Sequence, residues 1–131
     1  MKSDPSEYKE IIKKLLEKTR QQRVQWEYPP SQFGEVRYLD TFRCNLGPQS
    51  ADSFSFEITS TSERDDSLRR FLVMTDQGGN EIFRVATNDL PTSPEEEEVS
   101  QMIEEIYDLA RRQALKVEQK LVLASTLLDR V

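Results

Sequence analysis

The stretch Ser93-Pro94-Glu95-Glu96 opens the segment that decides the fold of this chain, and neither glycine nor proline follows before Leu128. A serine at the cap, a proline at the first helical position and a glutamate at the third are typical of a helix start. Apolar residues then recur at alternating steps of four and three, which is the pattern of a heptad stripe. They are Ile103, Tyr107, Ala110, Ala114, Val117, Leu121, Ala124 and Leu128. The sequence therefore predicts one long helix over 93–128 that buries a stripe.

Such a helix is longer than the domain it belongs to. About 35 residues of unbroken helix extend roughly 50 Å, whereas strands of ordinary length span about 20–30 Å. Residues 116–131 should therefore form a helical extension whose apolar side chains need cover. One interpretation is a kink near Leu115 and Lys116 that folds the tail back on the first helix. We favour the other, pairing with a second copy, because the sequence contains no helix breaker there. The predicted homodimer interface is Tyr107, Ala110, Ala114, Val117, Leu121, Ala124 and Leu128.

A second start signal lies at Asp4-Pro5-Ser6-Glu7, ahead of apolar residues at helical spacing, and predicts an amphipathic helix over 5–22. Between the two helices apolar and polar residues alternate, which indicates strands. The predicted strands cover residues 35–46, 53–59, 68–75 and 82–87, with a further short extended segment over 24–28. The sequence therefore predicts an α+β fold: an N-terminal helix, an antiparallel meander of four to five strands, and a long C-terminal helix packed on one sheet face. Residues 1–131 should form a single domain.

Composition limits the function. Hydrophobic residues make up 36% and charged residues 32% of the 131 positions, as expected for a soluble domain with a small core. No apolar run approaches the roughly 20 residues that cross a bilayer, and no signal-peptide pattern is present, so we expect no membrane association and a cytoplasmic location. The net charge of −6 argues against nucleic acid as a partner. The chain contains no histidine, which removes the commonest general base and metal ligand.

Four groups of residues could in principle perform chemistry, and each has a simpler interpretation. The glutamates at 95–98 suit the positive end of a helix dipole better than a Mg²⁺ site, because adjacent helical residues point in different directions. Residues 76–80 lack calcium-loop spacing and predict a hairpin turn. The acidic residues of 63–66 are expected in an exposed loop. Cys44 has no histidine to activate it and should be a core residue. We therefore expect no catalytic residue, no metal and no cofactor.

Aromatic and basic residues mix near the end of the first helix. Arg23, Trp26, Tyr28 and Tyr38 form a candidate ligand or partner surface. Interleaved aromatic and basic residues can bind nucleotides or single-stranded nucleic acid. The same alternation also places aromatic residues in a core with arginines at its rim, which is the simpler interpretation.

Several short motifs occur together in this chain: Leu15-Leu16-Glu17-Lys18-Thr19, a tryptophan at 26, Leu72-Val73-Met74-Thr75-Asp76 before Gly78-Gly79, and Ile106-Tyr107-Asp108-Leu109-Ala110-Arg111-Arg112. In this combination the chain resembles a loose group of small bacterial α+β proteins and domains with no assigned activity. The resemblance spans most of the chain. It implies the order of elements and an adaptor or accessory role, and it transfers no catalytic or binding residue.

The sequence thus favours a non-enzymatic protein-interaction module that dimerises through its C-terminal helix. The first alternative is a small-ligand or nucleotide-binding domain with a pocket near Trp26 and Tyr38. The second is a metal-assisted enzyme that uses carboxylates. A flat apolar patch would support the interaction module, and a deep aromatic pocket would support the binder.

Overall fold

A computed structural model describes residues 7–28, 41–47, 53–62, 68–87 and 93–131. Three helices and four strands lie within these residues. In chain order they are α1 (Lys9–Arg20), β1 (Thr41–Leu46), β2 (Phe54–Ser62), β3 (Leu68–Asp76), β4 (Glu81–Ala86), α2 (Pro94–Ala114) and α3 (Val117–Asp129). The predicted α+β class is confirmed.

The strands form one antiparallel sheet in the order β1-β2-β3-β4, which confirms the predicted meander. The segment around Trp26 does not add a fifth strand among the described residues. Its only strand-like pairing there is an isolated bridge, in which Glu27 and Arg43 exchange backbone hydrogen bonds of 3.0 and 2.8 Å. The first part of the predicted strand over 35–46 lies outside the described residues.

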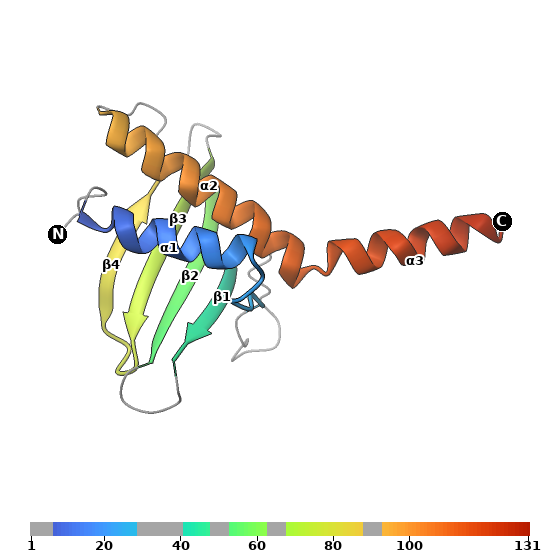
Figure 1. Ribbon diagram of the computed structural model, residues 1–131, viewed down its shortest axis with the longest axis horizontal. Coiled ribbons are helices and arrows are strands. Elements are labelled where there is room, and N and C mark those ends of the chain that lie inside the picture. The colour runs from blue at the N-terminus through green and yellow to red at the C-terminus, as the bar shows by residue number, and fades with distance from the viewer. Residues whose placement is uncertain (1–6, 29–40, 48–52, 63–67, 88–92) are drawn as a thin grey trace.

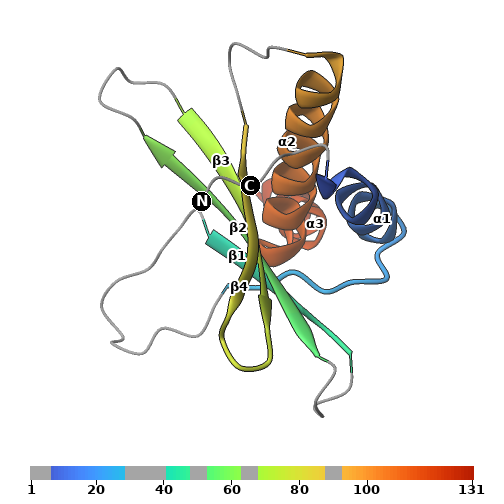
Figure 2. The same ribbon diagram turned by 90° about the vertical axis from the view of Figure 1, so that its left-hand side faces the viewer.

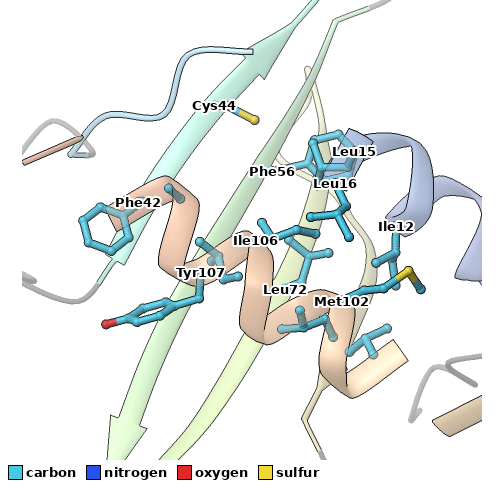
Figure 3. Close-up of a cluster of buried hydrophobic side chains, with 14 of the residues drawn as sticks. Ile12, Leu15, Leu16, Phe42, Cys44, Phe56, Leu72, Met102, Ile106 and Tyr107 are labelled. Carbon is cyan, nitrogen blue, oxygen red and sulfur yellow. The ribbon is translucent and has the colours of Figure 1, made fainter. Parts of the chain in front are cut away.

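Helices α1 and α2 cover the same face of the sheet (Figures 1 and 2). The apolar alternation of the strands points side chains such as Phe42, Ile58 and Leu72 at this face, where they are buried. Ile12 of α1 and Ile106 of α2 meet them from the helix layer (Figure 3). The core therefore lies between one sheet face and two amphipathic helices, as expected for a two-layer domain.

The start of α2 follows the predicted chemistry. Ser93 has an extended backbone, and its hydroxyl oxygen accepts a hydrogen bond of 3.2 Å from the backbone N–H of Glu96. Pro94 occupies the first turn, where its missing N–H costs nothing. Helix α1 begins at Lys9, later than predicted, and the Asp4-Pro5-Ser6 signal lies outside the described residues.

The prediction of one unbroken helix over 93–128 is wrong. Helix α2 ends at Ala114, and α3 begins at Val117. Between them Lys116 has left-handed backbone angles, φ 54° and ψ 47°. A lysine in this region costs about 1–2 kcal/mol, which is why sequence rules look for glycine at such a site.

Contacts on both sides of the break offset part of that cost. Arg112 and Glu118 form an ion pair of 2.8 Å, although residues six apart on a continuous helix point in different directions. The side chain of Gln113, in the last turn of α2, accepts a 2.8 Å hydrogen bond from the backbone N–H of Trp26. Tertiary contacts therefore accompany the end of α2, and the break lies near Leu115 and Lys116, where the kink interpretation placed it.

Candidate interaction surface

Helix α3 projects away from the two-layer domain (Figure 1). Its main contacts are with α2, the helix that precedes it. All residues from Glu118 to Val131 are exposed, and none of the residues of α3 is buried. The proposed alternative that the tail folds back on the first helix is therefore wrong.

One side of α3 is apolar along its whole length. Val117, Leu121, Ala124 and Leu128 follow one another at steps of four, three and four, and this set is the α3 stripe. Leu121 is 61% exposed and Leu128 is 71% exposed. Leu127, next to the stripe, widens it. A soluble domain seldom leaves so continuous an apolar surface without a partner.

The other sides of α3 hold the polar residues Glu118, Gln119, Thr126 and Asp129 together with the exposed apolar residues Val122 and Leu123. The helix has 13 residues, which is the length at which isolated helices are only marginally stable in water. Helix α3 therefore gains little stability from its own domain.

The residues of the predicted dimer interface lie in three places in the structure. Tyr107 and Ala110 are buried in the core of their own chain, where the Tyr107 ring lies 5.8 Å from Phe42 and 4.2 Å from the guanidinium carbon of Arg70. Ala114 and Val117 are half-buried at the junction of the helices. The part of the interface that is free for a partner is the α3 stripe beyond Val117.

The described residues of the predicted surface around Trp26 differ in their exposure. Trp26 is only 3% exposed, and its indole N–H donates to the Thr19 hydroxyl oxygen at 3.1 Å. Tyr28 is partly exposed and packs its ring 5.4 Å from Phe42, and Arg23 is exposed. Tyr38 lies outside the described residues. The tryptophan therefore belongs to the core of the domain.

The groups that could perform chemistry have structural roles where they are described. Burial raises the pKa of the Cys44 thiol to about 12, which favours the neutral thiol over the thiolate. Asp76 accepts hydrogen bonds from Asn80 within its own turn, and these hold the pKa of its carboxyl below the ordinary value. Glu98 pairs with Lys9 at 2.7 Å. Among the described residues no three acidic or cysteine side chains are grouped so as to hold a metal ion. The acidic residues of 63–66 lie outside these ranges.

The sequence pattern did not show that some apolar residues of the domain stay exposed or half-exposed, among them Ile11, Leu46, Phe54 and Met74. Each follows the apolar period of its helix or strand, so each reads as core. Only the positions of the two helices on the sheet reveal which apolar residues stay uncovered.

The chain matches no family model, no curated protein and no solved structure. The resemblance to small bacterial proteins therefore stays a prediction. No helix in the described part of the chain combines the length and apolar character that spanning a membrane requires.

Proposed function

We propose that this chain is a non-enzymatic protein-interaction module that forms a homodimer through α3. The single observation that carries the proposal is the exposed α3 stripe on a helix that contains no buried residue. The proposal includes a cytoplasmic location, which rests on composition, and a bacterial origin, which rests on the resemblance alone.

The energetics of α3 support an obligatory contact. Moving one leucine side chain from water to a packed surface gains about 2 kcal/mol. Leu121, Leu127 and Leu128 are each at least half exposed, so their burial could contribute several kcal/mol to association. A second copy is always present at the concentration of the first, and like copies pair most simply about a two-fold axis.

Two neighbouring residues of α3 provide a matched test. Leu121 belongs to the stripe, and Val122 points about 100° away; the two are similarly exposed, at 61% and 68%. We expect the full chain to show the mass of two copies by light scattering. Leu121→Asp should reduce it to one copy, because a charge would enter the contact. Val122→Asp should remain a dimer.

Three results would contradict the proposal. The wild-type chain could have the mass of one copy at every concentration up to the millimolar range. Leu121→Asp could leave the mass of two copies unchanged. Val122→Asp could dissociate the dimer as fully as Leu121→Asp, which would mean that added charge and not the α3 stripe controls assembly. Circular dichroism of both variants would verify that the domain is folded.

A further inference from the structure

The helix-covered face of the sheet is not covered along its whole length. In Figure 1 the strands continue past α1, at the end where β1 finishes and β2 begins. At that end Leu46 pairs with Phe54 across the two strands, and Phe54 is 37% exposed. Met74 of β3, opposite Phe56, packs against the core but is only partly buried. Three apolar side chains of the core face thus remain accessible.

Helix α1 adds a fourth residue. Lys9 and Arg20 pair with Glu98 and Glu105 of α2, which fixes the side of α1 that faces α2. Ile11 is 40% exposed. By helical spacing it lies beside the buried stripe of α1, on the flank away from α2 and toward the uncovered ends of the strands. We call Ile11, Leu46, Phe54 and Met74 the apolar shelf.

Pairing of α3 with α3 alone gives a small interface. Each helix is about 20 Å long and 10 Å wide, and side-by-side contact of two such helices covers at most about half of the roughly 800 Å² that each partner buries in a stable interface. An α3–α3 pair would also leave both shelves exposed. A dimer in which each α3 packs on the domain of the other copy has two contact regions, whereas an α3–α3 pair has one.

We propose that each α3 docks on the apolar shelf of the second copy, so that the two copies exchange their C-terminal helices. This inference rests on the proposed function and specifies its interface. The break at Lys116 directs α3 away from the strand ends of its own domain (Figure 1), so the helix that reaches a shelf comes from the partner. Such reciprocal exchange is a low-cost route to a symmetric dimer.

Charges beside the two surfaces are complementary. Lys14 and Lys18 lie along the same side of α1 as Ile11, at helical spacing, and both are exposed. The last turn of α3 holds Asp129, and Arg130 follows it at the C-cap. Lysines of a partner domain next to this turn would face Asp129 and the negative end of the helix dipole.

The test uses the full chain with charges placed in the shelf on two different elements. Phe54→Asp and Ile11→Asp should each raise the dimer dissociation constant about 100-fold or more, as Leu121→Asp does. Tyr28→Asp is the control, because Tyr28 has the same 37% exposure as Phe54 but lies near Phe42, away from the shelf. Tyr28→Asp should not change the dissociation constant. Trp26 fluorescence would verify that each variant is folded.

A mixing experiment separates exchange from pairing of the two helices. One chain with Phe54→Asp and one with Leu121→Asp retain, together, a single intact helix and a single intact shelf, so at near-millimolar concentration they should form a heterodimer that neither forms alone. A dimer that survives both shelf variants but not Leu121→Asp would overturn the exchange and leave the proposed function standing. A mixture that stays monomeric would overturn it as well. A wild-type monomer would remove both proposals.

Discussion

Thr19 links helix α1 to the segment that follows it. Its hydroxyl donates to the backbone carbonyl of Leu15 at 2.8 Å and accepts from the indole N–H of Trp26 at 3.1 Å, and the site is buried. The hydroxyl therefore satisfies a donor that would otherwise lie in the core without a partner. This pair explains why Trp26 is buried in spite of its polar atom.

Thr19→Val should lower the free energy of unfolding by about 1–3 kcal/mol, because the indole N–H would lose its acceptor in the core. Thr126→Val is the matched control, since Thr126 donates to the Val122 carbonyl at 3.0 Å in the same way but is exposed. The control should change stability by less than about 0.5 kcal/mol. Urea unfolding followed by Trp26 fluorescence measures both. Equal effects would show that the Trp26 bond contributes nothing.

Cys44 gives the chain a measurable pH dependence. Burial raises its pKa from the ordinary value of 9.0 to about 12 in the folded protein. The unfolded chain therefore loses this proton first as the pH rises. The contribution of Cys44 to stability is complete below pH 9.0 and decreases between 9.0 and about 12.

Above pH 9.0 we expect the Cys44 contribution to fall by about 1 kcal/mol per pH unit. The measurement is the free energy of unfolding against pH for wild type and Cys44→Ala, because lysines and tyrosines titrate in the same range and the difference isolates the thiol. The gap between the two proteins should narrow as the pH rises. A constant gap would mean that the thiol is not shielded from water.

At the scale of elements, the end of α1 has a geometry that its sequence does not optimise. Gln22 has a positive φ of 57°, and the next N–H, of Arg23, bonds back to the Lys18 carbonyl at 2.9 Å. This closing turn is one that glycine usually occupies, since a side chain is strained there. Gln22→Gly should therefore stabilise the domain by about 1 kcal/mol.

The neighbouring residue supplies the control for that substitution. Gln21 has ordinary helical angles, with φ −81°, so Gln21→Gly should destabilise the domain by about 0.5–1 kcal/mol through backbone entropy. Thermal or urea unfolding of the two variants should shift in opposite directions. A decrease in stability for both would indicate that the left-handed turn carries no strain.

The start of α2 could be predicted from the sequence more accurately than its end. The start of α2 depends on Ser93, Pro94 and a nearby backbone N–H, so it is visible in the sequence. The end of α2 depends on Gln113 reaching Trp26, 87 positions away. Strand order was predictable because each hairpin joins neighbouring strands, whereas the uncovered end of the sheet depends on where two helices happen to lie across it.

At the scale of the whole molecule, the apolar residues of one heptad pattern have two roles, one in the core and one on an exposed helix. Tyr107 and Ala110 complete the core of their own domain, and Leu121 and Leu128 continue the same stripe on a helix that the domain does not cover. Spacing alone could locate the stripe but could not divide it, because both halves have the same period. The division follows from the break at Lys116.

This division makes the stability of the domain depend on concentration. If association through α3 stabilises the folded state, the Tm of the full chain should rise with protein concentration, since binding between folded copies opposes unfolding. A chain that ends at residue 116 keeps every residue of the core between the sheet, α1 and α2. It should fold as a monomer whose Tm is independent of concentration.

Calorimetry of both chains over a 100-fold range of concentration provides the measurement, with Leu121→Asp as the full-length control. We expect the Leu121→Asp chain to behave like the truncated one, because each lacks the contact and keeps the domain. The two should share the Tm that wild type approaches on dilution. A truncated chain that fails to fold would show that α3 stabilises its own domain. A wild-type Tm that does not depend on concentration would show that the α3 stripe does not bind a second copy of this chain.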